Sequence, residues 1–158
     1  MRTITPPAPP TGLRRLLFRL PINLYRAHLG WLLAGRFMLL THTGRVTGKP
    51  RQVVIEAIDH DPAEGSYVGP SSYGQRSDWY RNILATPDVT VQVGSHAMPM
   101  TAAPLGPDES AELMARYGGK HPRLGKRLAR FMGFLVDGSM ADYREVGRRI
   151  QFVRFRPR

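Results

Sequence analysis

THTGRVTGKPR, residues 41–51, lies between an apolar run and a β-rich run, and the rest of the chain is organised around it. The stretch holds two glycines and three cations: Gly44, Gly48, Arg45, Lys49 and Arg51. A loop of this composition brings backbone N–H groups and cationic side chains to one anion. The same residues also suit a β-hairpin whose turn needs glycine and whose basic side chains are solvated. From these residues alone the two interpretations are an anion-binding corner and a plain hairpin.

Length and composition limit the chemistry. The 158 residues fit one domain with one core. The absence of cysteine excludes disulfides and thiolate ligands and permits a reducing compartment, so we expect a cytoplasmic protein. The five histidines show no metal-binding spacing, and we predict no catalytic metal.

The positive charge is concentrated in the first third of the chain. Residues 1–55 hold nine basic residues and no acidic one, whereas the remainder holds 14 basic and 12 acidic residues, for a net charge of +11. This field attracts nucleic acid, an anionic membrane surface or a polyanionic small molecule. We expect no nucleic-acid partner, because aromatic and basic residues do not alternate along a strand and no recognition-helix pattern is present.

The N-terminal segment has two parts. Residues 1–12 hold four prolines and predict a flexible arm, which leaves 13–158 as the single domain. Residues 13–20, LRRLLFRL, place leucines at i, i+3, i+4 and i+7 with arginines off that stripe, which predicts a basic amphipathic helix. The helix packs across the end of the domain, or residues 13–34 lie on anionic lipid at the inner face of the plasma membrane. Arginines interrupt every window long enough to be a transmembrane span.

Short β-strands dominate the middle of the chain. We predict strands at 36–42, 52–59, 66–69, 89–93, 97–103 and 150–155. Helices are expected at 78–86 with Ser77 as N-cap, at 107–117 and at 122–134, with a short helical turn at 140–146. This order favours an α+β protein with a closed or partly closed antiparallel barrel.

A second informative stretch, GPSSYGQRSDWYRN, covers residues 69–82. A small-residue loop precedes a helix start, so unpaired N–H groups lie beside a flexible segment. Trp79 and Tyr80 supply flat apolar faces, and Arg76, Arg81 and Asn82 supply directional hydrogen bonds. A planar heterocycle with an anionic tail fits this inventory, although a tryptophan in a small barrel is more often a core anchor.

Together, TGRVTGKPR, then SSYGQRSDWYRN, then LATPDVTVQVG resemble the deazaflavin-dependent nitroreductase family, also described as quinone reductases that use reduced coenzyme F-420. The resemblance implies a split β-barrel of FMN-binding type, flanked by helices and preceded by an N-terminal amphipathic helix. It implies that the corner binds the phosphate and oligoglutamate tail, that the loop lies along the deazaflavin ring, and that the next helix holds the linker. The implied coenzyme-binding residues are Gly44, Arg45, Thr47, Gly48, Lys49, Arg51, Ser72, Tyr73, Gly74, Arg76, Trp79 and Asn82.

The sequence departs from this family in one loop. Much of the family has a lysine and a second glycine where this chain has Tyr73-Gly74-Gln75, and Arg76 is the residue that can replace the lost charge. Ser72 and Tyr73 are the candidates to hydrogen-bond the acceptor. Tyrosines of the C-terminal helices contact substrate in some relatives, and Tyr117 and Tyr143 are the candidates here.

The resemblance implies hydride transfer from the coenzyme to a small electron-poor acceptor, a quinone-like or nitro compound. The alternatives are a non-enzymatic carrier of the deazaflavin or of a lipid-like ligand, and an FMN-dependent reductase. FMN is disfavoured because the corner carries more cations than one phosphate needs. We expect a monomer or a homodimer.

Overall fold

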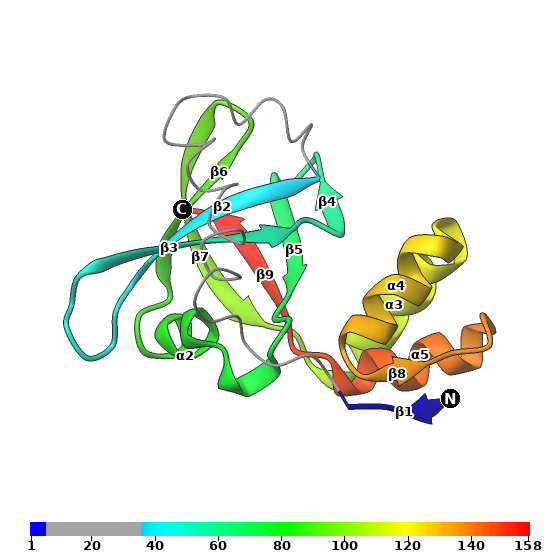
Figure 1. Cartoon of the computed structure of the whole chain (residues 1–158). Helices are drawn as coiled ribbons and strands as arrows, with labels where there is room; N and C mark the ends of the chain where they lie inside the picture. Colours follow the sequence, from blue (N-terminus) through cyan, green and yellow to red (C-terminus); the bar gives the residue numbers. More distant parts are fainter. Residues whose placement is uncertain (6–35) are drawn as a thin grey trace.

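The computed structural model describes residues 1–5 and 36–158, and at its centre a seven-stranded antiparallel sheet curls on itself (Figure 1). The strands are β2 (Phe37–Thr43), β3 (Pro50–Glu56), β4 (Asp59–Asp61), β5 (Ser66–Pro70), β6 (Asp88–Val93), β7 (His96–Pro104) and β9 (Phe152–Pro157). Their order across the sheet is β3-β2-β6-β7-β9-β5-β4. The α+β class and the antiparallel sheet are as expected. The single strand predicted at 52–59 is instead two, because Ala57 and Ile58 leave β3 before β4 pairs with β5.

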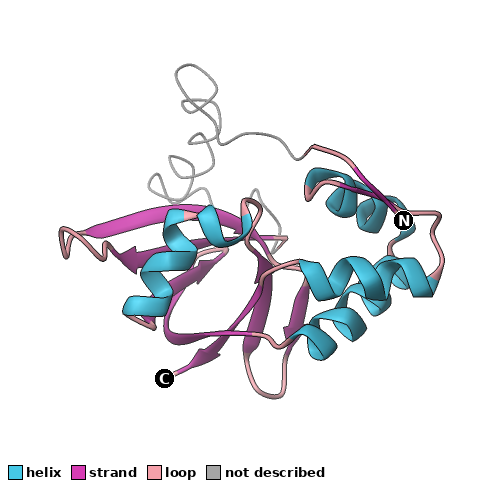
Figure 2. Cartoon of the chain, turned by 90° about the horizontal axis from the view of Figure 1, so that it is seen from below, coloured by secondary structure: helices cyan, strands magenta, loops and turns pink. Residues whose placement is uncertain are grey.

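The helices of the described residues occupy two places (Figure 2). Helix α2 (Asp78–Ala85) follows a short 3-10 turn, η2 (Gly74–Arg76), and lies near the end of β2. Helices α3 (Pro107–Lys120), α4 (Pro122–Phe131) and α5 (Met140–Arg149) form a separate group with the two-residue strand β8 (Phe134–Leu135). The two groups of helices therefore cover different parts of the sheet.

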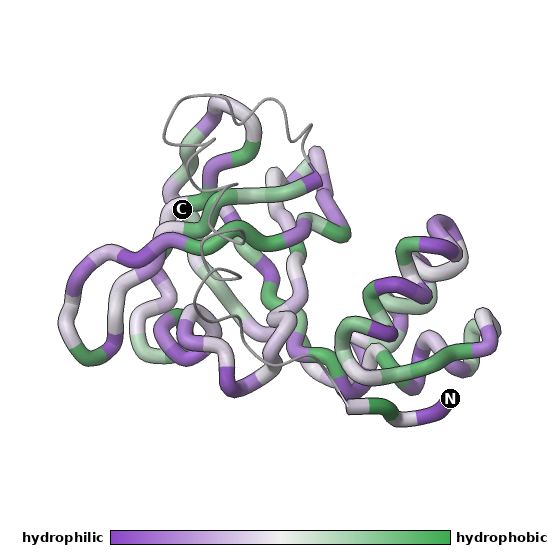
Figure 3. Tube along the Cα trace, in the orientation of Figure 1, coloured by the Kyte–Doolittle hydropathy of each residue, from purple (hydrophilic) through white to green (hydrophobic). Residues whose placement is uncertain are grey.

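Strand β9 shows how one sheet serves two cores. Val153 and Phe155 are fully buried in a core that includes Trp79 of α2. Phe152 is buried in a second core with Tyr143 and other residues of α3, α4 and α5. Successive side chains of a strand point to opposite faces, so β9 contributes to both cores. Apolar residues accordingly run along the strands, whereas the β2–β3 loop is largely hydrophilic (Figure 3).

The C-terminal helices differ in length from the prediction. Helix α3 passes the expected end at Tyr117, and α5 has ten residues instead of a short turn. Both contain glycines that the sequence signals as helix ends but that packing requires: a Cβ on Gly147 would lie 2.5 Å from the Ser110 carbonyl oxygen. Helix α4 stops at Phe131, not at 134, because Gly133 has φ of 99° and the chain then pairs as β8.

At the start of the chain, strand β1 (Arg2–Thr3) pairs with β8. These are residues of the predicted flexible arm; the rest of that arm from residue 6, and the amphipathic helix predicted within 13–34, lie outside the described residues. In the described part of the chain, every helix is too short or too polar to cross a membrane.

Candidate functional site

The loop between β2 and β3 closes on itself. The Gly44 N–H donates to the Lys49 carbonyl at 2.8 Å, and the Gly48 N–H donates to the Gly44 carbonyl at 2.8 Å. The Lys49 N–H donates to Thr47 Oγ1 at 3.2 Å, and Gly48 has φ of 70°, which favours glycine. The hairpin interpretation is therefore correct for the backbone. Three of the N–H groups expected to face an anion, those of Gly44, Gly48 and Lys49, are used inside the loop, so anion binding depends more on the side chains.

Arg45 ties this loop to helix α2. Asn82 Oδ1 accepts hydrogen bonds from the Arg45 backbone N–H at 3.0 Å and from Arg45 Nη1 at 2.9 Å. Arg45 Nη2 lies 3.3 Å from Asp78 Oδ1, at the first residue of the helix. The family resemblance implied that Arg45 binds the tail of the coenzyme and that Asn82 holds its linker. In the structure these two side chains are hydrogen-bonded to each other. We call this set, Arg45, Asn82 and Asp78, the latch.

His42 completes the inner side of the latch. Because Asn82 Oδ1 faces two donors, its amide Nδ2 must be the atom that lies 3.0 Å from His42 Nδ1. Nδ2 donates, so Nδ1 accepts and the ring proton is on Nε2. Burial lowers the pKa of His42 to about 4, with Asp78 opposing and Arg51 reinforcing that shift. The imidazole is therefore neutral near pH 7.

A groove of about 820 Å³ lies between the β2–β3 hairpin and the start of α2. Eight of the twelve residues predicted from the resemblance line it: Gly44, Arg45, Thr47, Arg51, Tyr73, Arg76, Trp79 and Asn82. Four others are outside its lining: Gly48, Lys49, Ser72 and Gly74. Residues of the two stretches 41–51 and 69–82 thus line the same groove, although a strand, a hairpin and a turn separate them in the chain.

The groove is positively charged. Among the described residues, no carboxylate lies within ion-pair distance of Arg51 or Arg76, and Asp78 is the one acid in the described lining. Ser77 holds the N-cap position of α2, but the expected side-chain hydrogen bond is not formed. The partial positive charge of the helix start therefore adds to the two guanidinium groups.

The aromatic residues play different parts. Trp79 is only 6% exposed and its ring centroid lies 6.4 Å from that of Phe155, so it is chiefly a core anchor, although it also lines the groove. Tyr80 is buried beside it and donates to Gln151 Oε1 at 3.2 Å. Tyr73 is half-buried in the groove wall. Tyr73 is therefore the aromatic side chain best placed to meet a ring.

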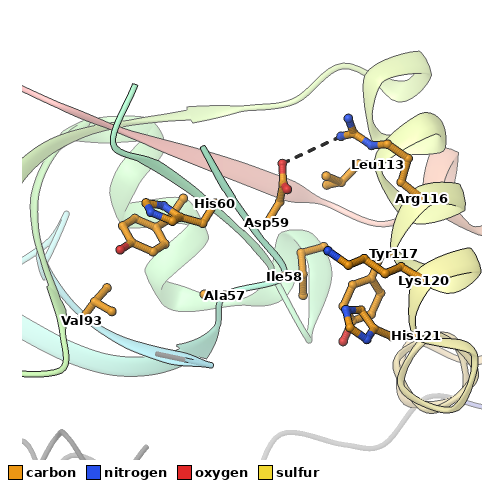
Figure 4. Close-up of a pocket in the computed structure, with 11 residues that line it drawn as sticks. Ala57, Ile58, Asp59, His60, Val93, Leu113, Arg116, Tyr117, Lys120 and His121 are labelled. Atoms are coloured by element: carbon orange, nitrogen blue, oxygen red, sulfur yellow. Dashed lines mark ion pairs between the residues drawn. The ribbon is translucent and has the colours of Figure 1, made fainter. Parts of the chain in front are cut away.

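A second cavity of about 570 Å³ lies at the other end of β3 (Figure 4). On the strand side the rings of His60 and Tyr67 stack with centroids 4.1 Å apart, and on the α3 side Tyr117 packs against His121. The two cavities have no lining residue in common. Of the two candidate C-terminal tyrosines, Tyr117 lines this second cavity, whereas Tyr143 is buried between the helices.

Tyr117 is held by a charged acceptor. Its hydroxyl donates to Glu56 Oε1 at 3.1 Å, and burial followed by the Glu56 charge raises the pKa of Tyr117 to about 12. On the same side of the cavity Arg116 Nη2 lies 3.9 Å from Asp59 Oδ2 (Figure 4). In residues 1–5 and 36–158, no cluster of three or more His, Asp or Glu side chains could hold a metal ion.

Sequence reasoning missed His42. A single histidine in an apolar strand pattern is usually a satisfied core residue, and nothing local marks it. Its role depends on Asn82, which lies 40 positions further along the chain. One feature of the sequence could have indicated this role. His42 lies just before the glycine-containing loop, and in a hairpin it is paired with Arg51.

Solved structures with the same architecture define the class of the protein as a split β-barrel. An F420-H2-dependent reductase, FDR-A, is 25% identical, and the match covers 77% of this chain and 93% of that one with a TM-score of 0.51. A Clostridium acetobutylicum protein of the pyridoxinephosphate oxidase family is 9% identical, with coverages of 87% and 84% and a TM-score of 0.50. The predicted fold is confirmed.

Within this class, the model of the F420H(2)-dependent quinone reductase family matches residues 18–131, and the chain belongs to that family. A Mycobacterium tuberculosis (strain ATCC 25618 / H37Rv) relative, Rv3178, provisionally named an F420H(2)-dependent quinone reductase, is 33% identical over 81 residues. That match covers 50% of this chain and 66% of the relative. The family resemblance drawn from the two motifs is confirmed, and the coenzyme in the family description is the expected one.

Proposed function

We propose that this protein is an oxidoreductase that binds reduced coenzyme F-420 in the groove and passes a hydride to an electron-poor acceptor, a quinone-like or nitro compound. Membership of the family supports the coenzyme. The observation that carries the proposal is the groove itself, in which Arg51 and Arg76 face the start of α2 with one acid in the described lining. A polyanionic coenzyme is the ligand such a charge distribution favours.

The residues of the groove fit this coenzyme. Guanidinium groups bind phosphate and carboxylate oxygens in a planar, two-pronged geometry, which suits the phosphate and glutamate tail. Tyr73 and the apolar side chain of Val53 offer flat or apolar contact to a ring. When bound, the coenzyme supplies the hydride chemistry.

The protein's own task is to bind, orient and exclude water. The latch fixes the β2–β3 loop against α2, so the backbone of this loop is held in place before a ligand arrives. Such preorganisation reduces the entropy lost on binding. Tyr73, in the groove wall, is our candidate to hydrogen-bond the acceptor. We retain Ser72 as the alternative, although it lies outside the lining of the groove, and Lys49 as a cation available to a long tail.

Titration of the purified protein with oxidised F-420 and with FMN, at low and high salt, tests the binding step. We expect tight binding of F-420 that weakens as salt rises, and weaker binding of FMN, which offers a single phosphate. FMN binding as tight as that of F-420 would contradict the proposal.

Turnover separates the enzyme from a carrier. Reduced F-420 is mixed with the protein and with a naphthoquinone or a nitroaromatic compound, and oxidation of the coenzyme is followed by its absorbance. Oxidation that requires protein supports a reductase. Binding without oxidation by either acceptor would favour the carrier function.

The sequence also leads us to propose a location and an assembly state. The protein is cytoplasmic and is a monomer or a homodimer, and residues 13–34 make a peripheral contact with the membrane. Sedimentation of the full chain with anionic and with neutral vesicles tests the contact. Equal sedimentation with both would contradict it, because arginines at the headgroups need negative charge.

A further inference from the structure

His42 Nε2 is a polar atom of the groove that takes no part in the latch. The hydrogen bond from the Asn82 amide to Nδ1 leaves the ring proton on this atom, which makes it a donor. It forms no hydrogen bond with any described residue. Yet within residues 1–5 and 36–158 no fully enclosed side-chain nitrogen or oxygen lacks a partner. Nε2 therefore keeps contact with solvent, and the hollow that His42 lines is the groove.

Arg51 lies beside this donor. His42 and Arg51 are paired across β2 and β3, so their side chains lie on the same face of the hairpin. Both line the groove, and the charge of Arg51 is felt by the imidazole. A neutral N–H and a guanidinium thus belong to neighbouring residues of the groove lining and do not repel each other as two cations would.

We propose that His42 and Arg51 form a specific seat for one oxyanion of the ligand, with Nε2–H donating one hydrogen bond and the guanidinium supplying charge. This inference rests on the proposed function, because the oxyanion is a phosphate oxygen or a tail carboxylate of the coenzyme. His42 is then a binding residue. Asn82 is the positioning residue that sets its tautomer, as second partners of histidine commonly do.

A hydrogen bond in this place is stronger than one at the surface. The residue is only 5% exposed, so the solvent contact that Nε2 loses when a ligand arrives is small. The acceptor is charged, which roughly doubles the strength of the bond. His42 is neutral near pH 7, so its contribution is directional and hardly depends on salt, whereas that of Arg51 is screened. The seat selects an anion that presents an oxygen to both donors.

Two substitutions separate the donor from the latch. In His42→Asn the side-chain oxygen lies near the position of Nδ1 and still accepts from Asn82, but the Nε2–H is lost. In His42→Gln the amide nitrogen reaches toward the position of Nε2 and can donate. We expect His42→Asn to bind F-420 roughly tenfold more weakly and His42→Gln to recover part of the loss. Thermal unfolding of both variants verifies that they fold.

The ligand side of the test compares three compounds: F-420 itself, its phosphorylated form without glutamates, and the deazaflavin with its ribityl chain but no phosphate. The phosphate-free compound should bind the wild type and His42→Asn equally. The phosphorylated form without glutamates shows the tenfold loss if the seat holds the phosphate, and no loss if it holds a tail carboxylate. Equal loss with the phosphate-free compound, or no loss with any compound, overturns the seat. Failure of the wild type to bind F-420 overturns the proposed function instead, so the two failures are distinguishable.

Discussion

The two hollows at opposite ends of β3 are built from similar residues but hold their charges differently. In the second cavity Arg116 lies near Asp59, and the Tyr117 hydroxyl is bonded to Glu56. In the groove, Arg51 and Arg76 have no carboxylate within ion-pair distance among the described residues. The arginine of the second cavity has a carboxylate beside it, whereas the groove leaves two guanidinium groups for a ligand to neutralise.

The difference shows why the presence of arginine alone does not mark an anion site. In an arginine that already has a carboxylate partner, part of the charge is neutralised and some of the N–H donors are used before a ligand arrives. Arg45 illustrates this within the groove, because its guanidinium is bonded to Asn82 and near Asp78. A basic motif in a sequence therefore divides into cations that build the site and cations that bind the ligand, and only the structure separates them.

The largest expected effect comes from removing the unpaired cations. Arg51→Ala with Arg76→Ala should weaken F-420 binding by about 3–6 kcal/mol, since each charged contact contributes about 1.5–3 kcal/mol. Fluorescence titration measures the change. The matched control, Arg116→Ala with Lys120→Ala at the second cavity, removes the same net charge and should leave the affinity nearly unchanged. Equal losses in both double variants would mean that total charge, not the groove, attracts the coenzyme.

The next effect is on stability and concerns His42. Its pKa is about 4 in the folded protein against an ordinary value of 6.5. Between these values the unfolded chain binds more protons, so the stability is fully present above pH 6.5 and is lost as pH falls toward 4. The loss amounts to about 3 kcal/mol. Asp78 of α2 favours the protonated ring and Arg51 of β3 opposes it, and burial outweighs both.

Urea unfolding at several pH values between 7.5 and 4.5 measures this loss. Carboxylates also titrate in the range, so the informative quantity is the difference between the wild type and His42→Asn. We expect the difference to shrink as pH falls. If His42→Asn and the wild type lose stability in parallel, His42 is not held neutral by burial.

Local signals in the sequence predicted the hairpin and the start of α2, because glycines, Pro50 and Asp78 determine turns and helix starts within a few residues. They also predicted where the C-terminal helices begin, but they misplaced the ends of these helices. Gly118 marks a helix end by local rules, but a Cβ there would lie 2.6 Å from the Tyr143 ring, so packing requires the glycine inside α3. Tertiary contact overrides propensity in such places.

The candidate site, too, could be predicted where local signals suffice and not where it depends on tertiary contacts. The two motifs bring most of the predicted residues to one groove, because each motif is a contiguous stretch near a turn. The pairing of Arg45 with Asn82 and the orientation of His42 depend on contacts between residues about 40 positions apart. Composition and spacing carry no signal for such contacts. A sequence can therefore identify the members of a site before it can assign their roles.

The smallest expected effect tests whether the two hollows are independent. Tyr117→Phe removes the hydrogen bond to Glu56, which should lower the free energy of unfolding by about 1 kcal/mol, because Glu56 remains near Arg36 and partly exposed. Urea unfolding measures that loss, and fluorescence titration should show unchanged F-420 affinity. Tyr143→Phe is the matched control, since its hydroxyl also donates one hydrogen bond, to the Pro122 carbonyl, away from both cavities. A tenfold loss of affinity in Tyr117→Phe but not in Tyr143→Phe would mean that β3 couples the cavities, and the contrast between them would no longer hold.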